Sequence, residues 1–149
     1  MRVIIGVLSL SLVALTGCQP QNPDVNVEKS WVRLSAVPDQ PAAAYFTLTG
    51  GASDDSLVAI HADTVQRTEL HETMVGMKGM STMAPLERVA LPAHTTVVFA
   101  PDGRHAMLFG VNPGVKPGQK MVLTYVFKSG VLLDDSARVI AAGAPAPKF

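Results

Sequence analysis

Short stretches in which apolar and polar residues alternate run along most of the chain, separated by glycine, proline and aspartate turns. In residues 43–49, for example, Phe46 and Leu48 lie on one face and Tyr45 and Thr47 on the other. Such a period of two is typical of a β-strand with one buried face. The pattern predicts nine short strands: 29–34, 43–49, 57–60, 65–73, 87–91, 95–100, 105–111, 120–128 and 131–140.

This series of strands predicts an all-β fold, an antiparallel sandwich or barrel in a single domain. No long amphipathic helix interrupts the series. A helix over residues 75–86 is the competing local interpretation, but Gly76, Gly79 and Pro85 disfavour it because glycine and proline weaken helices. We therefore expect little helix and a segment without regular structure between the fourth and fifth predicted strands.

The first seventeen residues are typical of a targeting segment. Arg2 supplies a positive charge, and residues 3–15 are apolar but too short to span a bilayer. The following Leu15-Thr16-Gly17-Cys18 resembles the lipobox of bacterial lipoproteins, in which the cysteine is acylated and the chain is cut just before it. An ordinary signal peptide followed by a chance cysteine is the alternative.

Lipidation of Cys18, the only cysteine, would leave the mature domain without a thiol and hold it on the periplasmic face of a bacterial membrane. Gln19 resembles the sorting pattern of outer-membrane lipoproteins, so that membrane is favoured over the inner one, with a soluble periplasmic protein as the alternative. The expected organisation is a lipidated N-terminus and tether at 18–27, a β domain at 28–142 and a flexible tail at 143–149.

Composition narrows the classes of function. Of the 149 residues, 48% are hydrophobic and only 16% charged, which excludes a disordered chain. The formal net charge is zero, which argues against a nucleic-acid partner because such proteins need a basic surface.

Histidine and methionine are the residues that suggest chemistry. The chain has four histidines and seven methionines, and four of the methionines fall between Met74 and Met83, just after His71. Farther on, His105 and Met107 are two residues apart on a predicted strand, so their side chains point to the same side. If the methionine segment folds against that strand, two imidazoles and two thioethers can meet around one ion.

Such a donor set favours copper(I). Thioether sulfur is a soft, neutral ligand, whereas zinc prefers imidazole, thiolate and carboxylate, and magnesium and calcium prefer oxygen. Two imidazoles and two thioethers leave the ion's charge uncompensated, which suits a monovalent cation better than a divalent one.

The spacing of these residues is distinctive. Eleven residues separate His71 from Met83, twenty-one separate Met83 from His105, and one separates His105 from Met107. This resembles the signature of the periplasmic copper chaperone family called PCuAC. Further parts of the sequence resemble the same family: Trp31-Val32-Arg33, Ala44-Tyr45, Asp55-Ser56-Leu57, Leu70-His71-Glu72, Leu91-Pro92, Pro101-Asp102-Gly103-Arg104, Gly118 and Phe127.

The resemblance implies a cupredoxin-like antiparallel Greek-key barrel and a copper(I) site formed by His71, Met83, His105 and Met107. It also implies a protein that is not an enzyme and that delivers copper toward assembly of the CuA and CuB centres of cytochrome c oxidase. Sco-type thiol proteins or cytochrome c oxidase subunit II would be the copper-accepting partners. Two departures stand out: Glu72 occupies a place where the family can carry methionine, and the tail lacks the His/Met-rich extension of some members.

Other candidate residues remain open at this point. Met74, Met77 and Met80 are either auxiliary copper ligands or structural residues, and Met80 competes with Met83 for the main site. His61 and His94 lie outside the pattern and are interpreted as surface or satisfied polar histidines.

Among the apolar and aromatic residues, Met121 is expected in the core. Trp31 and Tyr45 are expected as core or interface aromatics.

Four alternatives to a copper carrier follow from the residues. A periplasmic copper-buffering or resistance protein would use the same site, and a structural envelope lipoprotein would bind no metal. A blue-copper protein is disfavoured because no cysteine lies inside the domain. A zinc hydrolase is disfavoured because His71-Glu72 lacks the second histidine of the H-E-x-x-H motif.

Overall fold

The computed structural model of the protein describes residues 25–76 and 79–149 and contains ten strands and no helix within them. Accordingly, no helix in this part of the chain could serve as a membrane span. The strands are β1 (Asn26–Arg33), β2 (Ala42–Thr49), β3 (Asp55–His61), β4 (Arg67–Val75), β5 (Ser81–Leu86), β6 (Val89–Leu91), β7 (Thr96–Phe99), β8 (Arg104–Phe109), β9 (Lys120–Phe127) and β10 (Leu132–Ile140).

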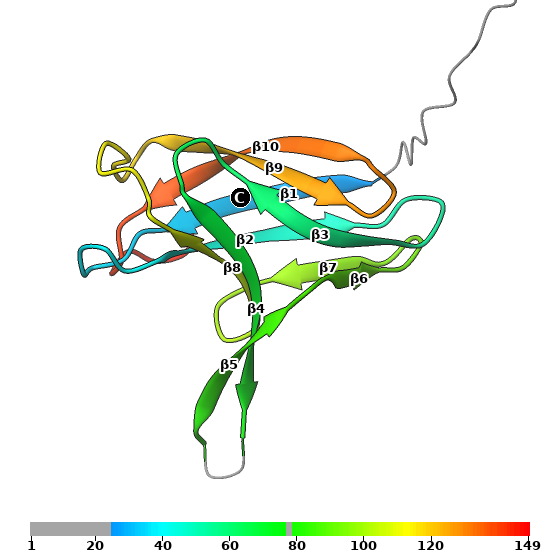
Figure 1. Ribbon diagram of the computed structural model, residues 1–149, viewed down its shortest axis with the longest axis horizontal. Coiled ribbons are helices and arrows are strands. Elements are labelled where there is room, and N and C mark those ends of the chain that lie inside the picture. The colour runs from blue at the N-terminus through cyan, green and yellow to red at the C-terminus, as the bar shows by residue number, and fades with distance from the viewer. Residues whose placement is uncertain (1–24, 77–78) are drawn as a thin grey trace, which may run out of the picture.

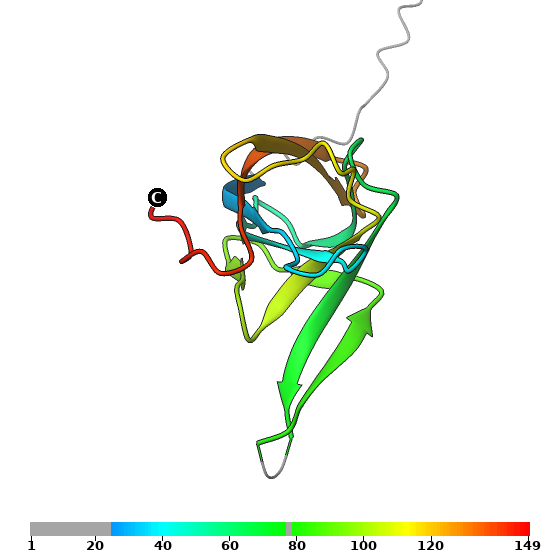
Figure 2. The ribbon, with the colours of Figure 1, turned by 90° about the vertical axis from the view of Figure 1, so that its left-hand side faces the viewer.

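The strands form one continuous sheet that curls round on itself (Figures 1 and 2). Its order is β5-β4-β8-β2-β1-β10-β9-β3-β6, and β7 pairs with β2. All pairs are antiparallel except β1 and β10, which run parallel. β2 joins two parts of the sheet, because its first residues pair with β8 and its later residues pair with β7.

The core lies inside the curled sheet and is built from alternate residues of the strands. Phe46 and Leu48 of β2 are almost fully buried, as the alternation predicts, and so is Met121, which is 3% exposed. The phenol of Tyr125 is also enclosed, and its hydroxyl exchanges a 2.9 Å hydrogen bond with the buried Ser30. The predicted core of β9 is thereby confirmed.

The hairpin of β4 and β5 projects away from the body of the barrel (Figures 1 and 2). Residues 81–86 were not predicted as a strand, and the competing helix over 75–86 is wrong as well. The reason is physical: β5 pairs only with β4 and is largely exposed on both faces, so its sequence shows no buried alternation. Pro85 fits this position, since proline is tolerated on edge strands.

Both ends of the described chain make contacts with the sheet. β1 begins at Asn26, two residues inside the predicted tether. In the C-terminal tail, Arg33 donates a hydrogen bond to the carbonyl of Ala144 (3.2 Å), and Arg138 donates one to the carbonyl of Lys148 (3.3 Å). The flexibility of residues 143–149 stays a prediction.

Candidate metal centre

The face of the β4–β8 pair that points away from the core carries three successive pairs of side chains. Antiparallel register sets each residue of β4 directly across from one of β8, and alternate residues share a face. On this outer face the pairs are Arg67 with Phe109, Glu69 with Met107, and His71 with His105.

His71 and His105 form the central pair of the candidate site. Their ring centroids lie 6.0 Å apart, with the planes tilted by 30°. Both rings are shielded from water, since the side chain of His71 is 13% exposed and His105 is 6% exposed. Two imidazoles are therefore held side by side on neighbouring strands, as the sequence analysis requires.

Met83 lies on the same face as the two histidines, but in a different strand arrangement from the one expected. Met83 does not lie on a strand next to the His105 strand; it belongs to β5, which pairs with β4 on the side away from β8. There Met83 pairs with Thr73, two residues along β4 from His71, so alternation gives both side chains the same orientation. His71, Met83, His105 and Met107 thus share one face of three adjacent strands.

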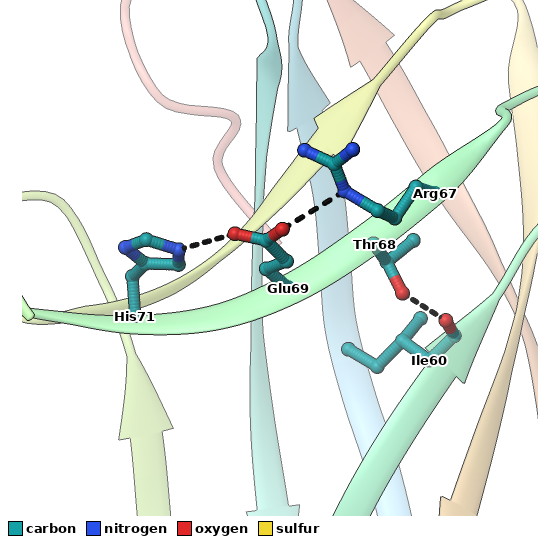
Figure 3. A network of polar contacts seen from close by, with 5 residues as sticks. All are labelled: Ile60, Arg67, Thr68, Glu69 and His71. Atoms are coloured by element: carbon teal, nitrogen blue, oxygen red, sulfur yellow. Dashed lines mark hydrogen bonds and ion pairs between the residues drawn. The ribbon is translucent and has the colours of Figure 1, made fainter. Parts of the chain in front are cut away.

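A polar chain that sequence reasoning missed runs along β4 beside this site (Figure 3). A 3.0 Å hydrogen bond joins Nε2 of His71 to Oε2 of Glu69. The other carboxylate oxygen, Oε1, lies 2.8 Å from Nε of Arg67. The hydrogen bond from His71 and the charge of Arg67 hold the pKa of Glu69 below its ordinary value, so the carboxylate is ionised at neutral pH. The missed signal is Glu69 itself, two residues before His71 on a predicted strand.

His105 is fixed from two other directions. Its Nδ1 lies 3.0 Å from the carbonyl oxygen of Gly103. Its ring lies 6.4 Å from that of Tyr45, which in turn packs 4.3 Å from Trp31. Burial raises the pKa of Tyr45, so its phenol is an uncharged neighbour of His105. Trp31 and Tyr45 are thus buried on the outer face, beside the site rather than within the main core.

The donor set indicates which kind of ion the site could hold. Within residues 25–76 and 79–149, no three side chains of the His, Cys, Asp or Glu type are grouped so as to hold a metal. The shared face also carries the thioether sulfurs of Met83 and Met107, which are further donors beside the two imidazoles. The buried Nδ1 of His71 has no hydrogen-bond partner, which leaves its lone pair available.

The remaining candidates lie elsewhere. Met74 pairs with Thr82, and Gly76 donates a hydrogen bond to the carbonyl of Met80, so both methionines follow the opposite alternation from Met83. The register therefore favours Met83 over Met80 as the partner of the two histidines.

Two predicted residues, Met77 and Cys18, lie outside the described residues, so their assigned roles stay predictions. His61 and His94 are exposed and belong to neither β4, β5 nor β8.

Comparison with known proteins identifies the family. The family described as "Putative lipoprotein LpqE-like" matches residues 25–134, which is most of the chain. The chain belongs to the LpqE-like family. The chain is also similar to the "Putative lipoprotein Lxx21020" of Leifsonia xyli subsp. xyli. The two are 30% identical over 131 residues, which cover 80% of this chain and 78% of the relative.

Solved structures connect the LpqE-like chain to PCuAC domains. The copper-bound PCuAC domain of PmoF2 superimposes with a TM-score of 0.66 at 20% identity, covering 78% of this chain and 92% of that one. The copper(I) form of DR1885 from Deinococcus radiodurans superimposes with a TM-score of 0.58 at 25% identity, covering 78% and 76%. These matches confirm the predicted cupredoxin-like β fold and the predicted relation to PCuAC domains.

Proposed function

We propose that this LpqE-like protein is a copper(I) carrier of the cell envelope that binds one ion through His71, Met83, His105 and Met107. The observation that carries the proposal is the arrangement of these donors on one face of β5, β4 and β8, with the two imidazoles directly paired. Copper-bound PmoF2 and copper(I)-bound DR1885, which share the fold, support the choice of metal.

The chemistry of the four donors suits carriage rather than turnover. Imidazole nitrogen and thioether sulfur are neutral, and four such ligands complete the coordination of copper(I) without leaving a position for a substrate. Met83 is 61% exposed on the edge strand, whereas His105 is 6% exposed. Ligand exchange with a partner would therefore begin at Met83, while the buried histidines hold the ion until transfer.

A copper(I) titration of the mature chain under reducing conditions tests the binding proposal. We expect one ion bound tightly, and loss of tight binding when His105 and Met107 are both changed to alanine. His61→Ala is the matched control, because this exposed histidine lies outside β4, β5 and β8 and its loss should leave the affinity unchanged. Failure of the wild-type chain to bind one ion tightly would reject the proposal.

The destination of the copper is the second part of the proposal. We assign delivery toward the CuA and CuB centres of cytochrome c oxidase, with Sco-type thiol proteins or subunit II as acceptors, on the relation to PCuAC domains. Copper buffering is the competing role, because the same site would serve it. A deletion strain separates them: lost oxidase activity at low copper supports delivery, and copper sensitivity alone supports buffering.

The place of action is the third part of the proposal. The LpqE-like family and the similar protein from Leifsonia xyli are both described as "Putative lipoprotein", which supports acylation at Cys18 and a membrane anchor. We assign the anchor to the periplasmic face, and Gln19 after the cysteine favours the outer membrane. Cys18→Ser should release the protein from the membrane fraction and remove the mass of the acyl chains. Unchanged fractionation and mass would reject the anchor.

A further inference from the structure

We propose that Glu69 is a positioning residue for the copper site: its carboxylate orients His71 so that Nδ1, and not Nε2, faces the metal. The inference rests on the proposed function and deepens it, because it names the nitrogen that binds and the side chain that selects it. His105 is expected to bind through the other ring nitrogen, Nε2.

The hydrogen bond between Glu69 and His71 fixes the tautomer of the imidazole. Oε1 of Glu69 accepts from Nε of Arg67, and Oε2 is left as the acceptor at the 3.0 Å contact, which places the ring proton of a neutral His71 on Nε2. A neutral imidazole then carries its lone pair on Nδ1. That atom is buried and has no hydrogen-bond partner among the described residues, as expected for a nitrogen that awaits a ligand.

Glu69 is itself held in place by a second partner (Figure 3). Arg67 contacts the carboxylate oxygen that His71 does not use, at 2.8 Å, and its guanidinium lies 4.1 Å from the ring centroid of Phe109. The two carboxylate oxygens are therefore engaged from opposite ends, which limits rotation of the group. Carboxylates that accept a hydrogen bond from a metal-binding histidine orient the ring and increase its basicity.

His105 shows the opposite arrangement. Its Nδ1 lies 3.0 Å from the carbonyl oxygen of Gly103, and because a carbonyl only accepts hydrogen bonds, the ring proton lies on Nδ1. The lone pair of His105 is therefore on Nε2. The two paired histidines thus offer different ring nitrogens, each selected by a separate acceptor.

The chain supplies a matched control in Glu72. This residue is next to His71 in the sequence but follows the other alternation of β4, and its carboxylate pairs with Arg104 at 3.2 Å. Its side chain is 36% exposed, close to the 39% of Glu69. Removing Glu72 deletes a surface ion pair of similar exposure without touching either imidazole.

The test combines nitrogen-15 NMR of the histidine rings with copper(I) titration of the mature chain. In the metal-free wild type we expect the proton of His71 on Nε2 and that of His105 on Nδ1, and copper(I) should shift His71 Nδ1 and His105 Nε2. Glu69→Ala should lose the single tautomer of His71 and weaken copper(I) binding by about 10- to 100-fold. Glu69→Gln, which keeps a carbonyl acceptor, should retain the tautomer and lose less affinity, and Glu72→Ala should change neither.

Three results would overturn the inference: the His71 proton on Nδ1 in the metal-free protein, copper(I) bound at Nε2 of His71, or equal effects of Glu69→Ala and Glu72→Ala. Thermal unfolding of each variant shows whether the fold persists, and Glu69→Gln provides the answer if Glu69→Ala does not fold. Failure of the wild type to bind copper(I) would instead reject the proposed function, and the tautomers of the metal-free chain would still test the role of Glu69.

Discussion

Replacing Met83 or Met80 by leucine separates the role of sulfur from the role of packing. Both side chains are mostly exposed, at 61% and 67%, and leucine is close to methionine in volume. Exposed substitutions of this kind change the free energy of unfolding by no more than about 0.5 kcal/mol. The two variants should therefore fold alike and differ only in whether the lost sulfur belonged to the copper site.

Met83→Leu should weaken copper(I) binding far more than Met80→Leu. Loss of a residue that only supports a metal ligand costs about 10- to 100-fold in affinity, so loss of one of four direct ligands should cost roughly 100-fold or more. A factor of 100 corresponds to about 2.7 kcal/mol, several times the expected change in stability. The register predicts no such loss for Met80, which follows the alternation of Met74 rather than that of His71.

Competition against a chromophoric copper(I) chelator measures these affinities, and thermal unfolding of the metal-free proteins checks the stability. Equal losses for the two variants would show that the face assigned by the strand register does not decide which sulfur binds. An unchanged affinity for Met83→Leu would remove this residue from the site altogether.

Three further predictions concern the scaffold and its pH response. Ser30→Ala should lower stability by about 1–3 kcal/mol because it leaves the buried Tyr125 hydroxyl without its partner, while adding Tyr125→Phe should recover part of that loss in denaturant unfolding. Gly50→Ala should destabilise the fold by about 1–3 kcal/mol, since a Cβ there would lie 2.2 Å from the Pro92 carbonyl oxygen; a melting temperature equal to wild type would contradict this. Burial raises the pKa of Tyr125 above its ordinary value of 10.0, so the unfolded chain loses this proton before the folded one does, and stability should fall as the pH rises above about 10. Tyr125→Phe should show a shallower decline in urea unfolding across the same range.

Strands with one buried face were predictable from the sequence. Phe46 and Leu48 alternate with polar neighbours because one side of β2 faces the core, and the same holds for Met121 in β9. The parallel pairing of β1 with β10 was not predictable, because it joins segments about a hundred residues apart that carry no local signal. β5 was missed because a strand exposed on both faces has no reason to alternate.

For the candidate site, the sequence suggested a set of donor residues but not their arrangement on the strands. The spacing of His71, Met83, His105 and Met107 suggested the donors, yet the sequence indicated a segment folded over β8 rather than a strand on the far side of β4. Glu69 was visible as a carboxylate two residues before a histidine on a predicted strand, but its hydrogen bond depends on rotamers that the pattern does not specify.

Pro85 on the outermost strand bears on how another protein could approach the copper. It sits directly across from His71, and it lacks the N–H that an added strand would need at that point. That point therefore offers no backbone donor to a protein that would receive the ion by extending the sheet. Such a protein would instead have to present its own metal-binding side chains to the exposed sulfur of Met83, so that recognition and transfer take place through the same few atoms.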